Sequence, residues 1–172
     1  AEGSAYTEPN VVIKPGASHT FNQRDIDALG AKFVGSAIVS SDVPVVATVM
    51  QVGETFQNML GYNGFTTGSA TVSLPLIMSN NNGFYTGIQI QNVGSEVANV
   101  TVDYGTNIGG SFNPADDTAT LDPGESTTFL QNTGQFEAPK YVGSATITSN
   151  QPVVAIVNQV LFGGAVLGTA YG

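Results

Sequence analysis

Apolar and polar residues alternate with a period of two along the middle of the chain, and this pattern predicts β-strands. Ile88 and Ile90 alternate with glutamines, and after a turn Val100 and Val102 alternate with polar residues. These two runs predict a hairpin with one buried face. In a third run, ATVSLPLIM, every second side chain lies on the same side of the predicted strand: Val72, Leu74, Leu76 and Met78.

Pro75 lies inside that third run and has no backbone N–H to donate to a neighbouring strand. The run is therefore expected to lie at the edge of a sheet. Together the three runs predict strands at about residues 70–78, 86–92 and 97–104.

The most apolar stretches of the chain are two copies of one sequence. FVGSAIVSSDVPVVATVMQV, residues 33–52, and YVGSATITSNQPVVAIVNQV, residues 141–160, lie 108 positions apart and agree at 12 of 20 places. Each predicts a strand, a Ser-Asp/Asn-x-Pro turn and a second strand that is central in a sheet, because both of its faces are apolar. Gly35 and Gly143 predict a bulge or a close approach of two backbones.

The similarity extends upstream at the same spacing. KPGASHTF, residues 14–21, and DPGESTTF, residues 122–129, each place a Pro-Gly pair before a short β-type run. Proline at the second position and glycine at the third predict a type II turn. Gln23 to Gly30 predicts a single helical turn.

The two copies define the expected domain organisation. Residues 1–66 match residues 109–172, whereas residues 67–108 have no earlier counterpart. We therefore expect a partial β module at 1–66, the back portion of a repeat, and a complete β-sandwich module at 67–172. The fold class is all-β: an antiparallel sandwich, immunoglobulin-like or jelly-roll, with about one and a half repeats of about 108 residues and about ten strands.

Three arrangements would cover the partial module. It borrows strands from a neighbouring subunit, it fuses with the complete module into one sandwich, or the chain is a piece of a longer array. In each case the inward-facing residues of both copies are expected to form the core: Val45, Ala47, Val49, Val72, Leu74, Ile88, Ile90, Val100, Val102, Val153, Ala155 and Val157.

Charge and composition narrow the function. Four basic residues stand against thirteen acidic ones, which gives a net charge of -9 and a pI near 4.1. Nucleic acid and anionic membrane surfaces are poor partners for such a chain. There is no apolar run of about 18 residues that could span a bilayer, and the start AEGSAYTEPN has no signal-peptide pattern, so we expect that any secretion signal has been removed or was not included. Sparse charge with many hydroxyl and amide residues is typical of a secreted β protein.

Candidate chemistry is scarce, and the sequence predicts a protein that is not an enzyme and has no cofactor. There is no cysteine, and the single histidine, His19, has no nucleophile motif beside it. The only candidate metal ligands are loop acids that could hold Ca²⁺, although they lack EF-hand spacing and equally fit solvated loop acids: Asp116, Asp117, Asp122 and Glu125.

The segments LPLIMSNNNGFYTGIQIQNVGSEVANVTVDY, LDPGESTTF and YVGSATITSNQPVVAIVNQV, with GYNGF leading into the LPL strand, resemble the tandem β-sandwich repeats of secreted bacterial cell-surface proteins. This resemblance implies structural and adhesive modules without a shared active site, located outside the cell or on its surface. Because its first copy is truncated, the chain is similar to the subunit of an extracellular filament in which neighbouring subunits complete each other's sheets.

Two functional hypotheses follow. In the first, copies of the chain form a filament or surface layer by β-strand exchange, and the termini donate the strands. The terminal residues expected at the contact are Ala1, Tyr6, Val11, Val12, Leu161, Phe162, Val166, Leu167 and Tyr171. In the alternative, the chain is a monomeric adhesin module that binds a glycan or another surface ligand through aromatic residues around SNNNGF: Tyr62, Phe65, Phe84 and Tyr85.

Overall fold

The computed structural model of the chain describes residues 6–52, 59–161 and 170–171. The chain divides into two compact units, residues 1–35 and residues 36–172.

The second unit is built from β-strands that pair only in the antiparallel sense. The prediction of an all-β antiparallel protein is therefore confirmed. The elements are β1 (Thr48–Val52), β2 (Met59–Asn63), β3 (Ser69–Ser79), β4 (Phe84–Asn92), β5 (Ala98–Tyr104), β6 (Asp117–Leu121), β7 (Ser126–Leu130), the 3-10 turn η3 (Gly134–Phe136), β8 (Tyr141–Leu161) and β9 (Ala170–Tyr171).

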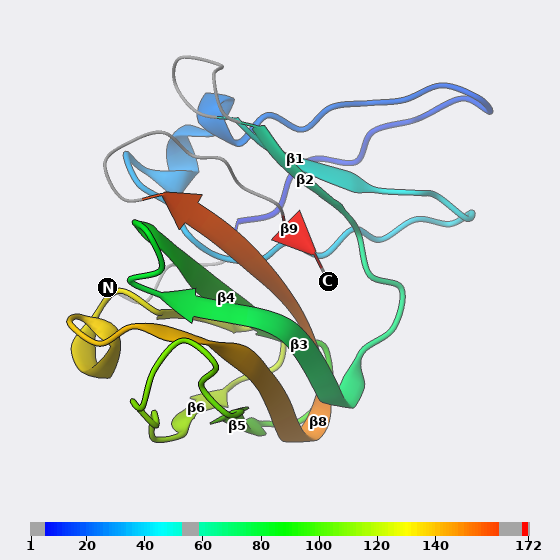
Figure 1. Ribbon diagram of the computed structural model, residues 1–172. Coiled ribbons are helices and arrows are strands. Elements are labelled where there is room, and N and C mark those ends of the chain that lie inside the picture. The colour runs from blue at the N-terminus through cyan, green and yellow to red at the C-terminus, as the bar shows by residue number, and fades with distance from the viewer. Residues whose placement is uncertain (1–5, 53–58, 162–169, 172) are drawn as a thin grey trace. The chain divides into compact units, whose positions relative to one another are not determined.

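The long strand β8 organises the main sheet. Its first half pairs with β3 and β5, and its second half pairs with β4 and β9. β6 extends the sheet beyond β5, and β7 extends it beyond β4. Because one strand serves both halves, β3 to β8 curl into a nearly closed, barrel-like sheet (Figure 1).

The predicted turn in the middle of the second copy is wrong, because β8 continues without interruption through residues 149–152. The pairing changes there instead. Pairs with β5 end at Ser149 and pairs with β4 begin at Val153. Backbone groups that a turn would have left unpaired are used by a new neighbour, so the strand stays extended.

Strand β3 confirms part of the prediction made for its sequence. It pairs with β8 alone among the described strands, as expected for an edge strand that contains Pro75. The register shifts between Leu74 and Ile77, however, and Ile77 is fully buried while Leu76 is not. The irregularity at proline brings Ile77 into the core, while Leu76 is half-buried and Met78, on the predicted side, is buried.

The core lies between the two halves of the sheet. The predicted residues that are buried there are Leu74, Ile88, Ile90, Val100, Val102, Val153, Ala155 and Val157, with Val72 packed against them. The prediction is wrong for two residues of the first copy, because Val45 is 46% exposed and Val49 is 40% exposed. Ala47 is only half-buried. No described strand flanks Val45 and Val49 as β3, β4 and β5 flank β8, so these side chains remain largely exposed.

Gly143 confirms the prediction of a close approach. A Cβ atom at this position would lie 2.9 Å from the Thr106 carbonyl oxygen and 2.7 Å from the ring of Tyr141. Gly35 stands in the same relation to an aromatic ring two residues earlier, because its Cβ would lie 2.7 Å from the Phe33 ring. Glycine is needed at both positions so that the ring can lie over the backbone.

The described part of the first unit, residues 6–35, contains no strand, so the β-run predicted after its Pro-Gly pair is wrong. Its regular structure is two 3-10 turns, η1 (Gln23–Asp25) and η2 (Asp27–Leu29), where one helical turn was predicted. The Pro-Gly turns themselves are confirmed in both copies. Gly16 has φ +76° and Gly124 has φ +81°, and each turn is closed by a backbone hydrogen bond of 2.9 or 3.0 Å.

Candidate interaction surfaces

Large apolar side chains are exposed mainly in the first copy. Within the described residues, all but four of them precede residue 67, and the four exceptions are Val93, Val97, Ile108 and Leu130. The segment Ser36–Val52 of the second unit carries the densest run, and only its end forms a strand, β1, paired with β2. The exposed apolar residues of this segment are Ile38, Val39, Val43, Val45, Val46, Val49, Met50 and Val52.

Equivalent positions of the two copies have opposite environments. Val39 is 58% exposed, whereas Ile147, 108 residues later, is fully buried. Val45 is likewise exposed, whereas Val153 is fully buried. The two segments have nearly the same sequence, so the difference comes from the strands beside them.

A few polar contacts join Ser36–Val52 to the main sheet without covering its apolar side chains. The Ser36 hydroxyl donates to the Gly124 carbonyl at 3.1 Å, and the Asn158 amide donates to Gln51 Oε1 at 3.4 Å. Val46, between these two contacts in the sequence, is completely exposed. The segment is therefore held at two points and remains apolar on its surface.

The ends of the two copies form similar hairpins. Val49 pairs with Tyr62 in the β1–β2 hairpin, and Val157 pairs with Tyr171 where β8 meets β9. Val49 and Val157 are 108 positions apart, and Tyr62 and Tyr171 are 109 positions apart. The second copy therefore contains one additional residue between the two members of its pair.

The aromatic residues predicted for a ligand surface do not all share one face. The rings of Tyr62 and Phe65 lie 6.4 Å apart, and Phe65 is 42% exposed. Phe84 and Tyr85 are consecutive residues of β4, so their side chains point to opposite sides of the strand. At most one of these two can lie on the same face as the Tyr62–Phe65 pair.

The terminal residues predicted at a subunit contact fall into three groups. Ala1, Phe162, Val166 and Leu167 lie outside the described residues. Leu161 pairs with Phe84, and Tyr171 pairs with Val157, so both of these belong to the chain's own sheet. The remaining three predicted residues, Tyr6, Val11 and Val12, lie in the first unit and are exposed, Val12 almost completely.

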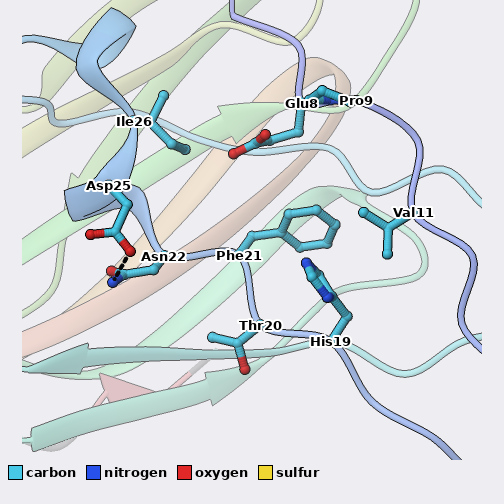
Figure 2. Close-up of a pocket in the computed structure, with 9 residues that line it drawn as sticks. All are labelled: Glu8, Pro9, Val11, His19, Thr20, Phe21, Asn22, Asp25 and Ile26. Carbon is cyan, nitrogen blue, oxygen red and sulfur yellow. Dashed lines mark hydrogen bonds between the residues drawn. The ribbon is translucent and has the colours of Figure 1, made fainter.

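The first unit also contains an open pocket of about 310 Å³ (Figure 2). Its apolar lining comes mainly from Val11, Phe21 and Ile26. The rings of His19 and Phe21 contact edge to face, with centroids 4.7 Å apart. The Asn22 amide donates to Asp25 Oδ2 at 2.8 Å, so this carboxylate is already engaged.

The loop acids proposed as calcium ligands are not brought together. Asp116 and Asp117 lie at the start of β6, and Asp122 and Glu125 follow its end, about 13 Å further along an extended strand. The Tyr104 hydroxyl donates a hydrogen bond to Asp117 Oδ2 at 2.7 Å, and the Asp122 backbone N–H donates to Glu125 Oε2 at 2.7 Å. In the described part of the chain, no three acidic or histidine side chains are placed to share a metal ion.

A buried polar network crosses the core, and sequence reasoning missed it. Gln131 is fully buried; its Oε1 accepts from the Thr86 hydroxyl at 2.8 Å, and its Nε2 donates to the Tyr104 hydroxyl at 3.2 Å. Burial, followed by the hydrogen bond to Asp117, holds the pKa of Tyr104 far above its ordinary value. Nothing in a lone glutamine after a strand distinguishes it from a surface residue, so no sequence signal could have identified it.

The fold and these surfaces define an all-β antiparallel protein in which one segment, Ser36–Val52, exposes its apolar side chains. No family model matches the chain, and no curated protein matches it. Among solved structures, "Crystal Structure of Thermotoga maritima 1070" is similar over 60% of this chain and 91% of that chain, with 18% sequence identity and a TM-score of 0.49. None of the helices in the described residues is long and apolar enough to cross a bilayer.

Proposed function

We propose that the chain is a non-enzymatic structural subunit of an extracellular filament or surface layer, and that neighbouring subunits join by β-strand exchange. One observation carries this proposal: Val39, Val45 and Val49 are exposed, although their counterparts in β8, Ile147, Val153 and Val157, are fully buried in the core. A neighbouring subunit that lays strands against this segment would bury the same surface that β3, β4 and β5 bury on β8.

The proposal includes the repeat architecture. Residues 1–66 are the back portion of a β-sandwich repeat, immunoglobulin-like or jelly-roll, and residues 67–172 are a complete module of the same kind whose layers share β8. Support comes from the sequence copies, from the matching Pro-Gly turns and from the corresponding β1–β2 and β8–β9 pairs. The kinship with tandem repeats of bacterial surface proteins is part of the same proposal.

Covering Ser36–Val52 with strands of a neighbouring subunit is energetically more favourable than leaving its apolar side chains exposed to solvent. Exposed apolar surface costs about 25 cal/mol per Å², and unpaired strand backbone is a template for another chain. A contact between two different surfaces of the same subunit does not close on itself and generates a fibre. The net charge of -9 keeps the free subunits soluble until they meet.

A pair of neighbouring substitutions tests the proposal. Val39 is the counterpart of the buried Ile147, whereas Ser40 is the counterpart of the exposed Thr148. In an exchanged strand, Val39→Asp would bury a charge and Ser40→Asp would not. We expect the wild-type chain and Ser40→Asp to form large assemblies in sedimentation velocity and electron microscopy, and Val39→Asp to remain a monomer.

The denaturant stability of the β3–β8 sheet provides the control, and it should change by less than about 0.5 kcal/mol in both variants because both positions are exposed. A wild-type chain that stays monomeric at every concentration would refute the proposed assembly. So would Val39→Asp subunits that assemble as the wild type does.

The second candidate function is an adhesin module, and the Tyr62–Phe65 pair is the observation that favours it. Exposed aromatic faces stack on sugar rings, and Asn63 between them offers amide hydrogen bonds. On a glycan array, Phe65→Ala should reduce any specific signal about tenfold, while Phe21→Ala, which removes another exposed ring, should leave it unchanged. Equal signals from the two variants would exclude this surface.

A further inference from the structure

The strand β1 has one edge that no described strand occupies. Its other edge pairs with β2, and the Gly64 N–H continues that pairing by donating to the Ala47 carbonyl at 2.8 Å. Residues of an antiparallel strand face their partner alternately, so the backbone groups of Thr48, Met50 and Val52 point to the unoccupied edge. This edge can accept one more strand.

The corresponding edge of β8 is occupied. Val157 and Asn158 pair with both β4 and β9, so these two strands lie on opposite edges of β8. The β1–β2 pair corresponds to the β8–β9 pair, and the open edge of β1 therefore corresponds to the edge of β8 that β4 covers. Since β4 is antiparallel to β8, the strand expected at β1 is antiparallel as well.

A segment of the first unit has the composition of a strand but no strand partner. Residues 9–13, Pro-Asn-Val-Val-Ile, lie 108 positions before β6, which pairs with β5. In the described part of the chain, no hydrogen bond reaches the backbone of residues 10–13. Val12 is 94% exposed, and Val11 and Ile13 are each 41% exposed. Donating this segment to another chain would open no sheet.

We infer that residues 10–14 of one copy of the chain add as an antiparallel strand to the open edge of β1 in a second copy. Within one chain, these residues form no pair with β1. The inference rests on the proposed strand exchange and names the donated segment, the accepting edge and their register. Because donor and acceptor are different surfaces, the contact passes from copy to copy without closing.

Two prolines determine the register. Pro9 and Pro15 flank the segment and have no N–H. A donor whose odd-numbered residues faced β1 would lose a hydrogen bond at one of these prolines. The even-numbered residues 10, 12 and 14 each have an N–H, and they match the outward-facing residues 48, 50 and 52 of β1. In the antiparallel sense, Val12 then lies opposite Met50.

The side chains that this register brings together are compatible. Val12 lies beside Met50, which is 62% exposed, and Ile13 lies beside Val49 on the other face of the strand. The net charge of -9 opposes contacts between copies, but residues 9–13 and 47–52 carry no charge. Lys14, the one charged residue of the added strand, is its last and is exposed. The contact therefore buries apolar side chains and pairs backbone groups without burying a charge.

Cysteine cross-linking of the full chain tests the contact, because the chain contains no cysteine of its own. Ile13 and Val49 form a non-hydrogen-bonded pair in this register, with Cα atoms about 4.5 Å apart, a distance that a disulfide spans. We expect Ile13→Cys chains mixed with Val49→Cys chains to form a covalent dimer in the presence of oxidised glutathione. Val12→Cys, whose side chain lies on the opposite face, should cross-link with Val49→Cys about tenfold less.

A chain that carries both Ile13→Cys and Val49→Cys distinguishes pairing between copies from pairing within one chain. Pairing between copies produces a ladder of covalent oligomers on a non-reducing gel, and this is the expected result. Pairing within one chain produces only a monomer with an internal disulfide. That monomer alone, or equal cross-linking by the Val12→Cys control, would overturn the inference.

A charge substitution links the contact to assembly. Val12→Asp places a charge beside Met50 and should raise the concentration needed for assembly about tenfold. Ile108→Asp adds the same charge at a side chain that is 82% exposed in the other unit, and it should have no effect. Wild-type chains that assemble without the Ile13–Val49 cross-link would overturn the inference alone. Chains that cross-link but never form large assemblies would refute the proposed filament alone.

Discussion

Placing a second copy of residues 67–108 directly ahead of residue 1 is expected to fold residues 1–66 into a stable module. The added segment supplies counterparts of β3, β4 and β5, which cover β8 in the complete sheet. Ser36–Val52 would then form a central strand with its apolar side chains buried. Backbone amides that now lack strand partners would become hydrogen-bonded and exchange slowly with solvent.

Hydrogen exchange followed by mass spectrometry measures this directly. Peptides from residues 36–47 should exchange on the order of 100-fold more slowly in the extended chain than in the original one. Self-assembly should also disappear, because the segment proposed to accept a neighbour is already covered. A chain extended by a scrambled segment of equal composition is the control, and equal protection in both extended chains would contradict the repeat architecture.

Truncating the same repeat position in the two copies is expected to have very unequal effects on stability. Ile147→Ala removes a fully buried side chain from the centre of β8 and should lower the free energy of unfolding by about 3 kcal/mol, since it leaves a cavity. Val39→Ala acts on a side chain that is 58% exposed, and it should change the free energy by less than about 0.5 kcal/mol.

Urea unfolding of the monomeric chain, followed by circular dichroism, provides both values. Measurements at low protein concentration keep assembly from adding to the apparent stability of Val39-containing chains. Substantial destabilisation by Val39→Ala under these conditions would mean that the first copy already packs into a core. Above the concentration at which wild-type chains assemble, Val39→Ala should become destabilising as well, because the proposed contact buries it.

The sequence predicted the positions of most strands of the complete module closely, but the hairpin predicted from the first two runs is wrong, because β4 and β5 each pair with β8 and not with each other. The alternation around Ile88 and Val100 located β4 and β5 within two residues at each end, and the apolar run after Pro152 located the central strand. These predictions succeeded because period-two patterning records which face of a strand is buried. The Pro-Gly turns succeeded because proline fixes φ at the second position of a type II turn and glycine accepts the positive φ at the third.

Predictions failed where a residue's environment depends on distant segments. The buried network of Thr86, Tyr104 and Gln131 joins two strands, β4 and β5, and the loop after β7, and no local pattern connects them. The acids around β6 are close in sequence but separated by the length of an extended strand. Of the residues predicted for interaction, the aromatic set divided because consecutive strand residues face opposite sides.

The sequence by itself determined that the chain forms antiparallel β-structure, that it is acidic, and that one apolar segment occurs twice. It could not determine whether each copy of that segment is buried. Only the tertiary structure decided this: β3 and β5 flank Ile147, while no described strand covers Val39. The physical reason is that a side chain is buried only when a second surface packs against it. A strand of nearly identical sequence therefore exposes its apolar side chains where the neighbouring strands are missing.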